Sequence, residues 1–155
     1  ERFPGPRRRV ALVMGHAAGS LRGLTTFGPG SFVAELVSLV GAENVVAGTA
    51  GAYPGVSLEA LLASGPEVIL DLHPGVALDA PARAALVADW AALPTVPAVV
   101  RGRVHILTDP AVLIPGPRIV ATAQLFAAAI HGAGIIQTAI CSAGRGNCIR
   151  LNEAR

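Results

Sequence analysis

Four histidines are the side chains of this sequence best suited to chemistry, and they are widely separated: His16, His73, His105 and His131. His16 and His73 each follow an apolar run, where a loop could present them to a ligand. No two of the four have the spacing of a metal motif. A metal-ligand role is open to His16 and His73, but a hydrogen-bonded loop histidine is the simpler interpretation. We therefore expect no protein-bound metal, and structural roles for His105 and His131.

Three aspartates and the single tryptophan are the other candidates. Asp71 lies inside an apolar run and could face a ligand cleft or cap a neighbouring loop; we favour the cap. Asp79 and Asp89 are typical of surface or helix-start positions. Trp90 could line a pocket, but we favour an anchor that packs a helix near Leu93.

Motifs of catalysis are nearly absent from the sequence. It contains no G-x-S-x-G, H-E-x-x-H or Walker A pattern. The run from Gly28 to Ser31 could cradle an anion on backbone N–H groups, yet a simple turn is favoured because Pro29 removes one donor. We expect no catalytic activity and no cofactor other than a transported ligand.

Composition excludes further classes of function. The net charge is only +2 and aromatic residues make up 4% of the chain, so we expect no nucleic-acid partner. The most apolar segment, residues 119–130, is shorter than the roughly 20 residues that a bilayer-spanning helix needs. The apolar excess is instead typical of strands that are buried on both faces.

Strand and helix patterns alternate along most of the chain, which predicts an α/β fold. We expect a three-layer, Rossmann-like lobe over residues 1–131, with a mostly parallel sheet of four to five strands flanked by helices. Residues 132–155 are expected to be an irregular or appended tail, in which Cys141 and Cys148 could form a disulfide. The expected strands are residues 9–15, 44–47, 67–72 and 103–107, and the expected helices are residues 32–40, 58–64, 80–92 and 117–131.

Such a sheet predicts where a ligand would bind, because open α/β sheets bind ligands beyond the carboxyl ends of their strands. The loops at that edge hold much of the glycine, proline, histidine and tyrosine of the chain, whereas the opposite loops are short. These edge loops are residues 15–29, 48–56, 73–79 and 108–116.

An ordered series of short motifs resembles a known family. The motifs are FGPGSF at 27–32, GAENV at 41–45, YPGVSLEAL at 53–61, GPEVIL at 65–70 and PGPRI at 115–119. In this order and spacing they resemble the C-terminal lobe of the class III periplasmic substrate-binding proteins of ABC importers. That family includes the vitamin B12-binding protein and receptors for ferric siderophores and haem. The resemblance covers about residues 8–131.

The resemblance implies a receptor with two lobes, joined by one long helix, that close on a metal chelate. The N-terminal lobe and the helix would precede Glu1, as would a signal peptide, which the first residues do not resemble. The implied location is periplasmic or lipid-anchored and extracytoplasmic. The implied partners are a metal-chelate small molecule and an ABC permease.

Individual residues acquire roles from the same resemblance. Tyr53 matches the aromatic residue that lines the cleft of the B12-binding protein, and Glu59 matches the acidic residue that docks onto permease arginines. Arg118 matches the Pro-Arg before the last helix, which implies a structural or a cleft-edge role. With His16 and His73 these complete the expected site. The motif around Tyr53 favours a corrinoid ligand, ahead of ferric chelates.

Two other functions stay open from the sequence. One is a small Rossmann-like nucleotide-binding enzyme domain using residues 15–31, although these lack G-x-G-x-x-G. The other is an oligomerisation domain that binds no ligand. Because a lobe without its partner would expose the edge around Tyr53 and Ile114, we also expect an isolated lobe to self-associate through that edge or to bind ligand very weakly.

Overall fold

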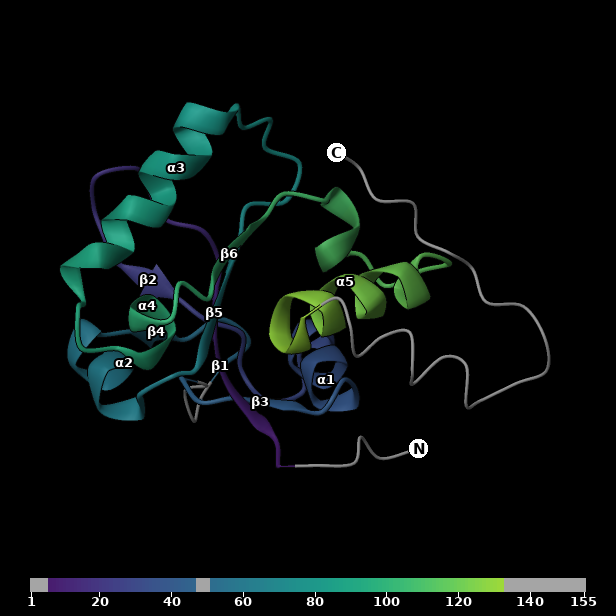
Figure 1. Cartoon of the computed structure of the whole chain (residues 1–155). Coiled ribbons are helices and arrows are strands. Elements are labelled where there is room, and N and C mark those ends of the chain that lie inside the picture. The colour runs from purple at the N-terminus through teal and green to yellow at the C-terminus, as the bar shows by residue number, and fades with distance from the viewer. Residues whose placement is uncertain (1–5, 47–50, 133–155) are drawn as a thin grey trace.

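The fold is built on a parallel four-stranded sheet. The computed structural model describes residues 6–46 and 51–132. The strands are β1 (Arg8–Val13), β3 (Ala42–Asn44), β5 (Val68–Leu72) and β6 (Val104–Leu107), in the spatial order β3-β1-β5-β6. All three pairings are parallel. The predicted α/β lobe is confirmed, with four strands in its main sheet (Figure 1).

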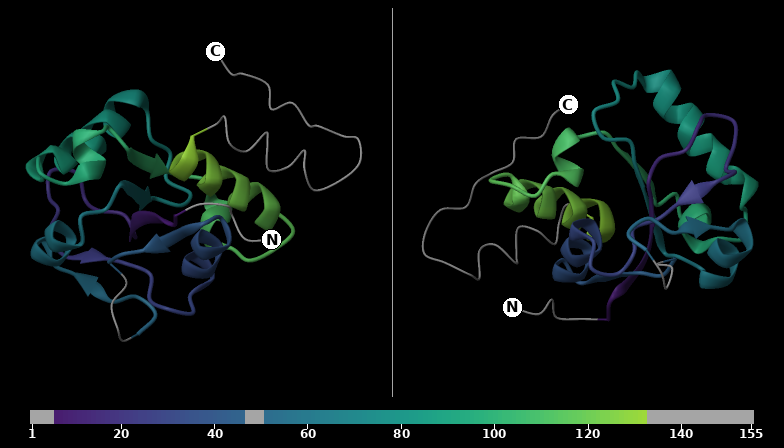
Figure 2. Two further views of the ribbon diagram at one scale, coloured as in Figure 1. Left: turned by 60° about the horizontal axis from the view of Figure 1, so that its bottom comes forward. Right: turned by 180° about the vertical axis from the view of Figure 1, so that it is seen from behind.

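Helices cover both faces of this sheet (Figures 1 and 2). On one face lie α1 (Phe32–Leu39) and α5 (Ile119–His131), and on the other lie α2 (Leu58–Ser64), α3 (Ala80–Asp89) and α4 (Pro97–Val100). Side chains alternate along β1: Val10 and Leu12 pack into the core with α1 and α5, and Ala11 and Val13 into the core on the opposite face. Burial on both faces explains why the strands are continuously apolar.

The helices begin where the sequence predicts. The side chains of Ser31, Ser57 and Asp79 each accept a hydrogen bond from the backbone N–H three residues later, at the starts of α1, α2 and α3. Gly65 ends α2 with φ +52°, a left-handed conformation that glycine adopts readily. The expected helix-start role of Asp79 is confirmed.

The strand predicted at residues 44–47 is wrong in position. β3 ends at Asn44, because the Asn44 side chain takes over the bonding there: its Oδ1 accepts from the Leu12 N–H at 3.2 Å, and its Nδ2 donates to the Phe27 carbonyl oxygen at 3.0 Å. Ala47, the last residue of the predicted strand, lies outside the described residues.

Short elements that were not predicted occupy the connections. The segment around Pro97 forms α4, and the 3-10 helix η2 (Pro110–Leu113) follows β6. The helix that was predicted over residues 80–92 is α3 followed directly by the 3-10 helix η1 (Trp90–Ala92). Two edge loops pair as the short antiparallel strands β2 (Leu24–Thr25) and β4 (Gly55–Val56). These loops are therefore tied to each other beside the main sheet.

Among the described residues, no helix combines the length and apolar character needed to cross a membrane. Cys141 and Cys148 lie outside the described residues, as does nearly all of the predicted tail.

The edge strand β6 carries a histidine that should make stability depend on pH. Burial, with a smaller contribution from the Arg103 charge, lowers the pKa of His105 below its ordinary 6.5. The unfolded chain therefore binds this proton more readily than the folded chain, so stability is lost as pH falls below about 6.5. We expect His105→Gln to lose less free energy of unfolding than the wild type between about pH 7.5 and pH 5.5, measured by urea denaturation. Equal losses in both proteins would contradict this assignment.

Candidate functional site

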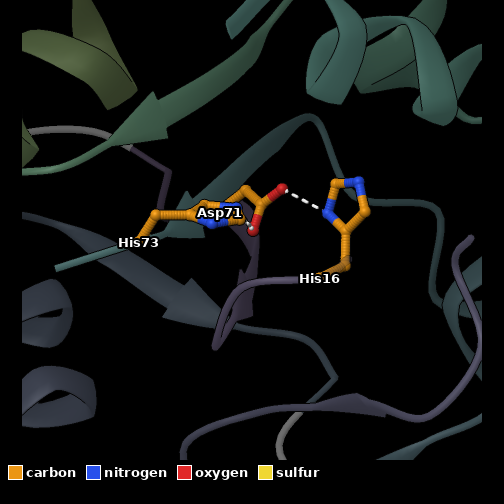
Figure 3. Close-up of side chains that lie close together, drawn as sticks. All are labelled: His16, Asp71 and His73. Atoms are coloured by element: carbon orange, nitrogen blue, oxygen red, sulfur yellow. Dashed lines mark ion pairs between the residues drawn. The ribbon is translucent and has the colours of Figure 1, made fainter. Parts of the chain in front are cut away.

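A buried cluster of polar side chains lies at the carboxyl edge of the two central strands. Its members, here called the His–Asp cluster, are His16, Asp71 and His73. His16 Nδ1 lies 2.7 Å from Asp71 Oδ2, and His73 Nε2 lies 3.0 Å from Asp71 Oδ1. The side chains of His16 and Asp71 are fully buried and that of His73 is 9% exposed. Figure 3 shows the Asp71 carboxylate facing both imidazole rings.

The ends of two adjacent strands bring these residues together. Val13 of β1 pairs with Asp71 of β5, so the chain that leaves β1 passes the carboxylate within a few residues. Gly15 turns this chain with φ +57°, and a Cβ there would lie 3.2 Å from the Leu72 carbonyl oxygen. Glycine thus permits the close approach that directs His16 toward Asp71.

The end of α3 holds the cluster from the other side. Asp89 Oδ2 lies 3.1 Å from His16 Nε2 and accepts from the Gly19 N–H at 2.8 Å. The Gly19 bond is the main cause that lowers the pKa of Asp89 below its ordinary 3.8, and His16 adds to it against an opposing effect of burial. Asp89 is therefore an ionised acceptor at neutral pH. Trp90 Nε1 donates to Asp71 Oδ2 at 3.2 Å.

Three polar atoms of the cluster converge without a directional hydrogen bond between them. They are His16 Nδ1, Asp71 Oδ1 and His73 Nε2, all buried. Their short N–O distances show that the atoms approach each other, but not along hydrogen-bond directions. One ligand atom from each residue lies within 4.8 Å of the others, an arrangement that a metal ion could occupy.

Several expectations about these residues are corrected. Asp71 caps no loop; its described partners are the two histidines and Trp90. Asp89 lies at the last position of α3, not at a helix start, and holds His16. His16 and His73, which the sequence treats as separate loop residues, lie together on Asp71, and both rings are buried or nearly so. The anchor role of Trp90 is confirmed, because it is fully buried in the same apolar cluster as Leu93.

The exposed candidates lie elsewhere on the molecule. Tyr53 is 60% exposed, and its ring meets the Phe27 ring edge-on with centroids 5.9 Å apart. The backbone beside it is tightly packed: a Cβ on Gly28 would lie 2.1 Å from the Gly51 carbonyl oxygen. Glu59 is exposed in the first turn of α2, and Arg118 is exposed at the N-cap of α5. Ligand and permease roles for these residues stay predictions.

The turn before α1 is confirmed as structural. The Gly28 N–H donates to the Ala52 carbonyl oxygen at 2.9 Å, and the Ser31 N–H donates to the Gly28 carbonyl oxygen at 3.2 Å. Since two of its donors are already used, this turn is a poor cradle for a phosphate. A hollow of about 480 Å³ is lined by residues 19–22, by Leu58, by residues 88–89 at the end of α3 and by residues 92–93.

Comparison with solved structures places this architecture in a class. No protein-family model matches the chain, and neither does any curated protein sequence. A periplasmic haem-binding protein from Pseudomonas aeruginosa matches with TM-score 0.65 and 29% identity, covering 83% of this chain and 44% of that one. A periplasmic binding protein from Veillonella parvula matches with TM-score 0.68 and 23% identity, covering 82% and 43%. The periplasmic vitamin B12-binding protein of Vibrio cholerae matches with TM-score 0.63 and 24% identity, covering 82% and 45%.

The chain therefore has the fold of one lobe of a periplasmic binding protein, and it spans less than half the length of these proteins. The proteins it resembles are class III periplasmic binding proteins, as the sequence motifs predict. They are substrate-binding proteins and not enzymes.

The bond between Trp90 and Asp71 should contribute measurably to stability. Trp90→Phe keeps an aromatic ring but removes the one indole donor to a fully buried carboxylate. We expect a loss of about 1–3 kcal/mol in the free energy of unfolding, measured by urea denaturation with circular dichroism. Tyr53→Phe, which removes an exposed hydroxyl, should leave stability unchanged. Equal stability of Trp90→Phe and wild type would show that the bond is unimportant.

Proposed function

We propose that this chain is the C-terminal lobe of the substrate-binding component of an ABC importer, and that its ligand is a flat metal-containing tetrapyrrole. The corrinoid expected from the sequence and the haem bound by several structural neighbours share this chemistry. Both present a broad apolar face and a metal that is already held by its organic ring. Extracytoplasmic location and delivery to a permease follow from the same proposal.

The observation that carries the proposal is the exposed ring of Tyr53. It lies in the loop that follows β3, at the sheet edge where open α/β folds bind ligands. The Phe27 ring packs against it at an interplanar angle of 75°, and Tyr53 is still 60% exposed. A supported, exposed aromatic face is suited to stacking against a planar macrocycle.

A second lobe would complete this site, because one exposed tyrosine covers only a small part of a macrocycle. Arg118 lies at the start of α5 and could pair with a carboxylate or amide of the ligand rim. Glu59 is exposed in the first turn of α2, where a permease arginine could reach it. Ligand binding and docking are thus assigned to different residues.

Ligand binding is tested on the full-length gene product that carries this lobe. Titrations with cobinamide, cobalamin, haem and a ferric siderophore are followed by absorption spectra. We expect saturable binding of a corrinoid or of haem, and an affinity about tenfold lower in Tyr53→Ala, the loss of roughly 1.4 kcal/mol of stacking.

Tyr53→Phe is the matched control and should bind like the wild type, since it keeps the ring. Binding of the siderophore alone would overturn the tetrapyrrole assignment. Undiminished binding by Tyr53→Ala would remove Tyr53 from the site.

Docking is tested separately by reversing the charge of Glu59. With an ABC permease that accepts this receptor, reconstituted in vesicles, we expect Glu59→Arg to reduce receptor-stimulated ATP hydrolysis about tenfold while ligand affinity is unchanged. Glu35→Arg is the matched control, because Glu35 is also an exposed acid in the first turn of a helix. Equal effects of both reversals would indicate a general charge effect and contradict docking at Glu59.

A further inference from the structure

We propose that the His–Asp cluster binds one divalent transition-metal ion as a resident part of the lobe. The ligands would be His16 Nδ1, Asp71 and His73 Nε2. This ion is distinct from any metal inside a transported chelate, and the inference does not depend on the proposed function.

The chemistry of the three atoms favours a metal of the zinc, cobalt or nickel kind. Two imidazole nitrogens and one carboxylate form a donor set that such metals prefer, whereas calcium and magnesium prefer oxygen ligands alone. The three atoms are buried, face one another and make no directional hydrogen bond. Leaving three buried polar atoms unsatisfied is costly, and one cation would satisfy all of them.

The groups around the cluster have the arrangement that metal ligands usually require. Because the Asp89 carboxylate accepts from His16 Nε2, the proton belongs on that nitrogen, and Nδ1 is left with a lone pair that is free to bind a metal. In zinc sites, a carboxylate commonly accepts a hydrogen bond from the ring nitrogen of a histidine whose other nitrogen binds the metal. The Trp90 indole similarly holds Asp71 Oδ2.

The same tautomer leaves a place for a cation in the cluster. With the proton on Nε2, His16 Nδ1 and Asp71 Oδ2 are two acceptors 2.7 Å apart, which repel each other without a cation or a further proton between them. A metal would remove this repulsion. Ligands bonded at about 2.1 Å lie about 3.4 Å apart around a tetrahedral ion, so His16 Nδ1 and Asp71 Oδ2 would move apart by about 0.7 Å from their separation of 2.7 Å as the ion binds.

The position of the His–Asp cluster in the fold indicates what the ion would do. His16 belongs to the loop after β1, Asp71 to β5, and Asp89 and Trp90 to the end of α3 and the start of η1. A metal at this point would join a long edge loop to the central sheet. Its effect should therefore appear as stability of the lobe.

The test uses the full, untagged chain after treatment with EDTA. Isothermal titration with Zn²⁺ should give one ion per chain, and Zn²⁺ at 100 times its dissociation constant should raise the melting temperature by about 5–10 °C. Co²⁺ should give the visible absorption bands of a tetrahedral site. His73→Gln should abolish stoichiometric binding, and Asp89→Asn should weaken it about 10- to 100-fold.

His105→Gln is the matched control, because it removes a partly buried histidine outside the cluster, and it should bind Zn²⁺ like the wild type. Anomalous scattering from crystals of the unaltered protein soaked in Zn²⁺ gives an answer even if a variant fails to fold, and should place the ion between His16 and His73. Absence of stoichiometric binding, binding retained by His73→Gln, or anomalous density elsewhere would overturn the proposal. None of these outcomes bears on tetrapyrrole binding.

Discussion

A carboxylate with no exposure to solvent, Asp71, is the constraint on which much of this lobe depends. Burying a charge is costly unless groups of opposite character surround it. The Trp90 indole at the start of η1 supplies one donor here, and two imidazoles approach the carboxylate from the loop after β1 and the end of β5. The need to compensate one acid thus fixes the course of three segments that are distant in the sequence.

The sequence predicts the local features of the fold well, because their causes are local. Ser31 and Ser57 cap helices through atoms three residues away, and β5 is apolar at nearly every position because helices cover both of its faces. The carboxyl edge of the sheet could also be predicted, since strand direction alone determines it. The exposure of Tyr53 and Glu59 could be predicted from their places in the expected loop and helix, without knowledge of tertiary contacts.

The His–Asp cluster could not be predicted in this way, because its members have no sequence spacing in common. Its one available signal was that His16 and His73 each follow a strand, which places them together only if those strands are neighbours. The pairing of Val13 with Asp71 supplies that information. The role of Asp89 was harder still to predict. An acid at the C-terminal end of a helix interacts unfavourably with the helix dipole, and the partner that explains this position, His16, lies in another segment. The position of β3 was predicted wrongly for a similar reason: the Asn44 side chain, and not a strand backbone, accepts the hydrogen bond from the Leu12 N–H.

The single tryptophan and the single tyrosine of the chain lie in contrasting surroundings. Trp90 is fully buried against His16 and Asp71, and Tyr53 is largely exposed at the sheet edge. Light absorbed near 295 nm excites an indole and spares a phenol, so the emission of this lobe reports the interior beside the His–Asp cluster alone. The exposed edge has its own chromophore, whose quenching by an added macrocycle can be read without labelling. The interior and the exposed edge of this lobe thus each have an intrinsic chromophore, Trp90 in one and Tyr53 in the other.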